Sequence, residues 1–461
     1  MGSRATLTDA MIALNRFGLG AHPDEPLPSD AKTWLLGQLD AFAGKSAIFQ
    51  AARASEDIAA EFAAGQQRVR NADEAGKMAI RQDLRKQGQA LYRAEVEMRA
   101  RAALDATAPF IERLVHFWSN HFAVSANKPQ VTVLAGAFER EAIRPYVLGR
   151  FEDMLLAVER HPAMHHFLDQ VRSIGPNSPA AQRVAARKAN RKLGINENLA
   201  REIMELHTLG ARSGYSQKDV TEFALALTGW SAGMMGSRNQ TPGTFTFLPA
   251  RHEPGARTIM GKTYGQRGQG QARAVLADLA ATPATADHIA AKLARHFIAD
   301  VPPQSIVERL SAAFRVSGGD LPTVYRALID APEAWMPQPV KFKTPWDWTI
   351  SALRAIGRRD VDGMNLTPLL NQLGQPVWRP GSPAGYDDMN ASWAAPDALV
   401  RRVEVAQRFA ARAASGHDAR TLARKLYADS LSEPTKQQID RAESPQTALA
   451  LLLVSPEFQR R

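Results

Sequence analysis

The chain of 461 residues contains no cysteine. Disulfide bonds, thiolate metal ligands and cysteine nucleophiles are therefore excluded. Long apolar runs are also missing, because the longest, at 448–454, is far shorter than the ~20 residues that a membrane-spanning helix needs. Residues 1–16 lack the apolar segment of a secretory signal peptide. We expect a soluble protein that either stays in the cytoplasm or is exported, after loss of a leader or together with a partner.

The motifs of several common enzyme classes are missing too. The sequence has no G-x-S-x-G nucleophile elbow and no glycine-rich dinucleotide fingerprint after a strand. The triplet G-K-T at 261–263 lacks both the preceding strand and the first glycine of a P-loop. We therefore do not expect nucleoside triphosphate binding at this triplet.

Charge of one sign is not concentrated anywhere, although the chain is basic overall. Lys and Arg number 57 against 47 Asp and Glu, which gives a formal net charge of +10. The excess is spread along the chain, without a compact basic block interleaved with aromatic residues. Because dispersed charge raises non-specific attraction without making a groove, we do not expect nucleic-acid binding.

Composition favours helices over sheet. Alternating runs of Val and Ile are scarce, whereas Ala, Leu and Arg dominate. Residues 231–270 differ, because they are rich in Gly, Thr and Pro, and T-F-T-F at 244–247 alternates as a strand does. We predict a mainly α, multi-helical globular protein with a small extended or β-ribbon insertion near residues 240–265.

Four segments follow from these patterns. Residues 1–106 are expected to form N-terminal helices with a charged helical arm, because charges of both signs on long helices are typical of a solvated hairpin. Residues 107–230 are expected to form a central helical core that carries the polar motifs. An extended flap at 231–270 and a C-terminal helical lobe at 271–461 complete the prediction.

The most informative stretch is N-E-N-L-A-R-E-I-M-E-L-H-T-L-G at 196–210. Its apolar residues recur at helical spacing and form a core-facing stripe, and Gly210 ends the helix. A second face carries the polar side chains Asn198, Arg201, Glu202 and Glu205, whereas His207 points elsewhere. Carboxylates this close to core positions usually need partners. The pattern predicts either an ion-pair network or a functional site, and the residues alone leave both interpretations open.

Two other helical segments carry histidine. The first, at 116–122, places Asn120 and His121 at the end of an apolar, aromatic helix. The second, at 161–169, spaces His161, His165 and Asp169 four residues apart, an arrangement that suits zinc, iron or manganese. Pro162 points instead to His161 as the N-cap of a helix, so a purely structural role stays open.

Two irregular segments are further candidates. In R-H-E-P-G at 251–255, His252 either reaches over a site or only supplies the polarity of a turn. The segment 375–393 is rich in Pro, Gly and aromatic residues, a composition typical of loops that line clefts or cover cores. The segment 173–189 has poor periodicity and predicts a surface loop.

Taken together, these motifs resemble the bacterial family called domain of unknown function 1800. The resemblance rests on L-N-R-F-G-L-G, F-W-S-N-H-F, H-P-A-M, the 196–210 motif, G-Y-S-Q-K-D-V, A-L-T-G-W, H-E-P-G with I-M-G, and the final S-P-E-F-Q, and it covers about residues 13–459. The motif positions that it carries over are Asn120, His121, His161, Asp169, Asn196, Glu197, Asn198, Arg201, Glu202, Glu205, His207 and His252. His165 and His166 do not match that family's pattern, which weakens the stripe of His161, His165 and Asp169 as a metal site.

The resemblance implies a mainly helical fold and no particular activity. Members of that family often occur beside a second family, numbered 1501, which resembles sulfatases and phosphatases and often bears a twin-arginine leader. It therefore implies a periplasmic protein with a sulfatase- or phosphatase-like partner, while a cytoplasmic location stays the alternative.

The leading hypothesis is a metal-assisted or acid/base hydrolytic enzyme that acts on a polysaccharide or anionic substrate. Its site would lie between the three histidine-bearing helical segments. The expected catalytic residues are Asn198, Arg201, Glu202, Glu205 and His207. A divalent metal is the expected cofactor, with His121, His161 and Asp169 as its ligands, and Asn120 and His252 are expected to bind substrate. The alternative is a non-catalytic helical scaffold or accessory protein for the exported partner.

Overall fold

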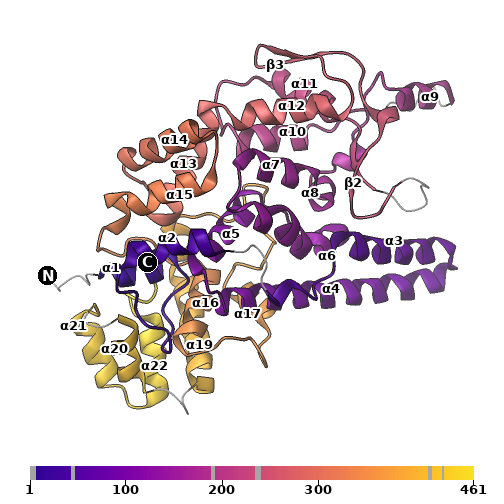
Figure 1. The fold of residues 1–461 in the computed structure, drawn as a ribbon. Helices are drawn as coiled ribbons and strands as arrows, with labels where there is room; N and C mark the ends of the chain where they lie inside the picture. The colour runs from indigo at the N-terminus through magenta and orange to yellow at the C-terminus, as the bar shows by residue number, and fades with distance from the viewer. Residues whose placement is uncertain (1–6, 43–46, 188–192, 234–239, 414–417, 428–429) are drawn as a thin grey trace.

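A computed structural model describes residues 7–42, 47–187, 193–233, 240–413, 418–427 and 430–461. It confirms a mainly helical protein with short β-strands confined to 230–264 (Figure 1). In the described part of the chain, no helix is both long and apolar enough to cross a membrane. One cluster of buried apolar side chains extends from Leu7 to Phe458 and draws on all four predicted segments.

The N-terminal quarter contains the predicted charged arm, which is a helical hairpin that projects from the body (Figure 1). Its two helices cross closely, because a Cβ added at Gly65 would lie 2.4 Å from Leu84. The Asp73 side chain accepts a hydrogen bond from the Gly76 N–H and caps the second helix of the pair. The helices of this quarter are α1 (Asp9–Ile12), α2 (Ala31–Ala41), α3 (Ser55–Asn71) and α4 (Glu74–Leu104), with a π-helical segment at Ala13–Phe17.

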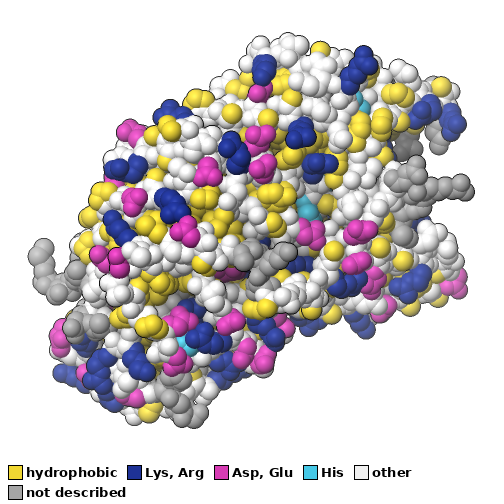
Figure 2. Space-filling model, viewed as in Figure 1, with side chains coloured by type: hydrophobic (Ala, Val, Ile, Leu, Met, Phe, Trp, Pro, Cys, Tyr) yellow, Lys and Arg dark blue, Asp and Glu magenta, His cyan; other side chains and the backbone are white. Residues whose placement is uncertain are grey.

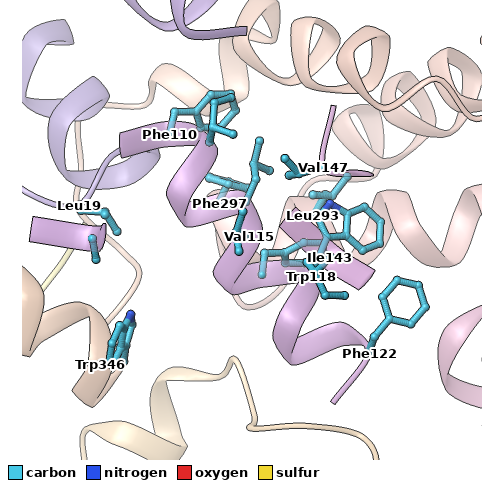
Figure 3. Close-up of a cluster of buried hydrophobic side chains, with 14 of the residues drawn as sticks. Leu19, Phe110, Val115, Trp118, Phe122, Ile143, Val147, Leu293, Phe297 and Trp346 are labelled. Carbon is cyan, nitrogen blue, oxygen red and sulfur yellow. The ribbon is translucent and has the colours of Figure 1, made fainter. Parts of the chain in front are cut away.

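Helix α5 (Pro109–His121) passes through the centre of the protein. Every residue of α5 except Asn120 is buried. Figure 3 shows its side chains Phe110, Val115 and Trp118 packed against Phe297 and Leu293 from a distant part of the chain. The Trp118 indole donates a hydrogen bond to the Tyr325 hydroxyl at 2.7 Å, so the one polar atom of this large core residue is satisfied.

The helices that follow α5 surround it. They are α6 (Pro129–Phe138), α7 (Phe151–Arg160), α8 (Pro162–Phe167), α9 (Pro179–Arg187), α10 (Asn198–Glu202), α11 (Gln217–Leu227) and α12 (Gln269–Ala280), with π-helical segments at Glu139–Ile143 and Ile203–His207. The loop predicted for 173–189 is wrong over much of its length, because α9 occupies it. Pro179 takes the first helical position, where proline is tolerated, and an alanine-rich run follows it.

The extended region contains two small antiparallel sheets instead of one ribbon. Strand β1 (Trp230–Ala232) pairs with β2 (Phe245–Phe247), which is the predicted T-F-T-F strand. Strand β3 (Arg257–Ile259) pairs with β4 (Lys262–Tyr264) across a tight turn. Both turn residues, Met260 and Gly261, have positive φ, as a two-residue hairpin requires.

The C-terminal half is again helical. Its helices are α13 (Pro283–Phe297), α14 (Gln304–Ser317), α15 (Leu321–Asp330), α16 (Pro345–Ala355), α17 (Leu366–Gln372), α18 (Asn390–Trp393), α19 (Pro396–Ala413), α20 (Ala419–Tyr427), α21 (Glu433–Asp440) and α22 (Pro445–Val454). Between α17 and α18 the chain is largely irregular and returns to the end of α5. Figure 2 shows basic and acidic side chains interspersed over the face in view.

Candidate functional site

A cavity of about 600 Å³ lies where four distant parts of the chain meet. It is bounded by the C-terminal half of α5, by α13, by the start of α16 and by the segment 375–388. Its aromatic lining consists of Phe117, Trp346, Trp378 and Tyr386. Cavities of this size, which combine aromatic walls with polar groups that converge on one space, are typical of sites for small molecules.

Helix α13 supplies four of the titratable side chains that line the cavity. His288, Lys292 and His296 follow one another at intervals of four residues, and Arg295 lies beside them. Such spacing places side chains on one helical face, while the apolar residues of α13 pack into the core. None of these residues was predicted from the sequence, although the pattern H-x-x-x-K-x-x-x-H is present at 288–296.

Two imidazoles of the cavity are held by consecutive backbone carbonyls. The Nε2–H of His288 donates to the carbonyl of Leu206 at 3.0 Å, and that of His121 donates to the carbonyl of His207 at 3.2 Å. Both carbonyls belong to the last turn of the 196–210 helix, where backbone carbonyls receive no hydrogen bond from an N–H of the same helix. Because a carbonyl only accepts, each neutral ring carries its proton on Nε2 and keeps a free lone pair on Nδ1.

The environment keeps both rings neutral. Burial, followed by the nearby Lys292 ammonium, lowers the pKa of His288 to about 4. The same two causes place the pKa of His121 well below its ordinary value. Burial also lowers the pKa of Lys292 to about 8. At neutral pH the cavity therefore combines neutral imidazoles with an amine that still holds its proton but releases it readily.

A layer of buried ion pairs lies behind His296. Asp388 accepts a hydrogen bond from His296 Nδ1 at 2.6 Å and lies 3.3 Å from Lys341 Nζ. Burial alone would raise the pKa of Asp388, but His296 and Lys341 outweigh it, so the pKa of this carboxyl lies below its ordinary value. Asp347 is likewise paired with two guanidinium groups, those of Arg113, at 3.0 Å, and Arg461.

Of the ten predicted site residues, Asn120 and His121 line this cavity. Asn120 donates from Nδ2 to the Tyr386 carbonyl at 2.8 Å and accepts from the Tyr386 N–H at 2.7 Å. These two bonds use one of its two N–H groups and one acceptor position of its oxygen. Asn120 therefore positions the segment 375–388 against α5.

The five residues predicted to be catalytic do not line the cavity. His207 is completely buried and donates from Nδ1 to Glu159 at 2.7 Å, and neither side chain exposes any surface. Arg201 lies 3.2 Å from Glu197 in a partly exposed pair. Glu197 also accepts from Gln217 and Thr221 and so joins α10 to α11.

The remaining three lie toward the outside of the same helix. Asn198 is exposed, and its N–H donates to the Asn196 side chain. Glu202 is half-buried, and burial raises its pKa. Glu205 lies beside Tyr215, whose pKa is raised by burial and by Glu205. These placements agree better with the network interpretation of the 196–210 motif than with a site centred on it.

The predicted metal ligands are not brought together. His161 caps α8 and lies 3.3 Å from Glu141, beside a separate groove, while Asp169 lies 2.9 Å from Lys128. The expected stripe fails because α8 ends at Phe167 and Asp169 adopts a left-handed conformation with φ of 59°. His165, inside α8, donates to the Glu159 carbonyl at 2.8 Å. Among the residues that the structure describes, no group of three or more His, Asp or Glu is placed to hold an ion.

His252 also lies outside the cavity. Its Nδ1–H donates to the Thr228 carbonyl at 2.8 Å. The adjacent Glu253 accepts from the backbone and the side chain of Asn177. The R-H-E-P-G turn thus fastens the extended region to the helical body.

Comparison with known proteins adds a family and no activity. A family model described as "Protein of unknown function (DUF1800)" matches residues 12–460. No curated protein and no solved structure matches the chain.

The first prediction concerns the buried pair of Glu159 and His207. His207→Ala should lower the free energy of unfolding by about 3–5 kcal/mol, because it leaves the Glu159 carboxylate buried without a partner. Arg201→Ala, which breaks a partly exposed pair in the same motif, should cost only about 0–1 kcal/mol. Urea denaturation measures both values. Equal losses in the two variants would contradict a special role of the buried pair.

The second prediction concerns Gly210, which follows the carbonyls that hold the two rings. It has φ of 87°, and a Cβ added to it would lie 2.9 Å from His288 Nδ1. Gly210→Ala should therefore both strain the backbone and displace His288.

Gly214 is a matched control, because it has φ of 85° and open space around its Cα. Gly214→Ala should show the strain alone, about 1–2 kcal/mol. Thermal unfolding, together with the NMR titration of His288, separates the two effects. If Gly210→Ala and Gly214→Ala lower stability equally and leave the titration of His288 unchanged, the contact between residue 210 and His288 does not contribute to stability.

Proposed function

Because the chain belongs to the DUF1800 family, whose description assigns no reaction, we propose a function from the cavity itself: acid/base hydrolysis of a small molecule or chain end. The observation that carries this proposal is the placement of a neutral imidazole, His288, and a readily deprotonated amine, Lys292, four residues apart on one wall of one cavity.

His288 is the proposed base. Its Nε2–H is held by the Leu206 carbonyl, and its Nδ1 has no hydrogen-bond partner within the described residues. A water molecule that gives its proton to Nδ1 can attack a substrate bond as hydroxide does. The fixed Nε2 bond also keeps the ring in the tautomer that this step requires.

Lys292 is the proposed acid. No ion pair or hydrogen bond engages its ammonium group within the described chain, and its pKa of about 8 lies close to neutrality. An acid with such a pKa is mostly protonated at pH 7 and still transfers its proton easily to a leaving group. His296, held by Asp388, is available on the same wall for a second proton transfer.

The metal-assisted form of this hypothesis has less support. The residues proposed as ligands, His121, His161 and Asp169, are engaged in three different places. The acid/base form needs only groups that line one cavity, so we adopt it.

The third prediction tests this function with chromogenic esters, phosphate monoesters and glycosides. We expect turnover of at least one class. His288→Asn and Lys292→Met should each lower kcat by about 10²–10⁴-fold, the usual contribution of a positioned acid or base. Lys218→Met, at an exposed position outside the cavity, is the control and should leave turnover unchanged.

The pH dependence of the same reaction provides a second readout. The value of kcat/KM should rise as His288 loses its proton above about pH 4 and fall as Lys292 loses its proton above about pH 8. Lys292→Met should remove the alkaline limb. Absence of turnover with every class, or variants as active as the parent, would overturn the proposal.

A second candidate is an accessory role toward a sulfatase- or phosphatase-like partner of the 1501 family in the periplasm. It is favoured by the α3–α4 hairpin, whose distal part projects from the body and exposes charged side chains and Met78 (Figure 1). A projecting hairpin offers a partner two helical faces without disturbing the core.

The fourth prediction tests this role by reversing charge on the arm. The triple variant Arg81→Glu, Arg85→Glu and Lys86→Glu changes exposed positions only, so it should fold as the parent does. If the arm binds the partner, co-purification of the two co-expressed proteins should be lost. Unchanged recovery of the partner, or none with the parent chain, would reject this candidate.

A further inference from the structure

The cavity has a second functional end at Arg99, which the acid/base chemistry does not use. Arg99 comes from α4, and its guanidinium lies close to two indole rings that also line the cavity. The carbon Cζ is 4.2 Å from the ring centroid of Trp346 and 5.6 Å from that of Trp378. Both indoles thus lie within cation–π distance of the guanidinium, whose N–H groups still point outward in its own plane for hydrogen bonds.

One edge is already occupied. Glu139 accepts from Arg99 Nε with both carboxylate oxygens, at 2.9 and 3.1 Å. The Trp378 indole donates to the same carboxylate at 3.0 Å, which fixes the carboxylate in turn. Arg99 is only 8 % exposed, so this orientation is held inside the protein.

The other edge is unused. Neither Nη atom makes a hydrogen bond in the part of the chain that the structure describes, because both hydrogen bonds of Arg99 to Glu139 come from Nε. A buried guanidinium that lines a cavity with two parallel N–H donors matches the two oxygens of a carboxylate or a phosphate. This geometry differs from that of a structural arginine, whose donors are normally consumed by the protein itself.

The acids of the cavity do not oppose an anion there. Asp347 and Asp388 are each neutralised by buried cations. Asp387 is exposed at the rim, where water screens its charge.

We propose that Arg99 binds an oxyanion of the substrate, a carboxylate or phosphate group, end-on through its two Nη atoms. This inference rests on the proposed function and adds the substrate class: a small acid whose reacting bond lies beyond the anionic group. The anion anchors at Arg99, beside Trp346 and Trp378, and the rest of the molecule extends along the cavity that α13 lines.

The fifth prediction uses two probes, inorganic phosphate and benzoate, with binding followed by tryptophan fluorescence and calorimetry. At least one probe should bind the parent and change the emission of the flanking tryptophans. Arg99→Lys keeps the positive charge beside Glu139 but removes the two parallel Nη donors, so the affinity for the probe should fall about tenfold or more. Arg93→Lys, at an exposed position of the same helix, should bind as the parent does.

Circular dichroism checks that Arg99→Lys is folded. If Arg99→Lys does not fold, the double variant Arg99→Gln with Glu139→Gln replaces it, because it provides a neutral pair of similar volume. That double variant should bind neither probe. Binding of phosphate alone or of benzoate alone identifies the group and supports the proposal. Absence of binding by the parent, or unchanged affinity in the folded Arg99 variants, overturns it.

His288→Asn separates this inference from the proposed function. It should bind the probe with the affinity of the parent while it loses turnover. Retained turnover in this variant would reject the base, whereas retained probe binding in the Arg99 variants would reject the anchor.

Discussion

The buried contact between Glu159 and His207 is the interaction on which the site depends. It joins α7 to the last turn of the 196–210 helix without exposure of either side chain. The carbonyl of His207 then holds His121, the carbonyl of Leu206 before it holds His288, and the carbonyl of Glu159 holds His165. A single buried pair thus sets the position of a helix end, and the helix end sets the orientation of two rings. A charged or strongly polar pair is costly to bury, so the two side chains must lie within hydrogen-bond distance to offset that cost.

The cavity is walled by helices and by one irregular segment, and each of them is held in place by its own contacts. Helix α5 is buried along nearly its whole length and gives a rigid support. Helix α13 packs its apolar face against that support and turns its polar face to the cavity. The segment 375–388 closes the remaining side, held at Tyr386 by the carboxamide of Asn120. Arg99 reaches the cavity from α4 and Trp346 from the start of α16, so five regions of the chain must be in place before the cavity exists.

Patterns within one helix were predictable from sequence, and contacts between helices were not. Composition predicted the helical class, charges of both signs predicted the hairpin, and apolar and aromatic residues predicted the helix that ends near His121, because each pattern depends on residues close in sequence. The metal stripe at 161–169 failed because that argument assumed one continuous helix, whereas α8 ends at Phe167. The surface loop at 173–189 failed because proline at the first helical position begins a helix as readily as it interrupts one.

The sequence by itself determined the mainly helical class and the absence of cysteine chemistry, and it indicated the charged helices of the N-terminal quarter. Only the tertiary structure decided that the 196–210 motif supports the cavity from behind, and that His288, Lys292 and Arg99 face it. The reason is that a side chain's role depends on what lies opposite it. Burial lowers the pKa of Lys292, and Arg99 lies beside the same cavity, only because residues nearly 200 positions apart are packed together.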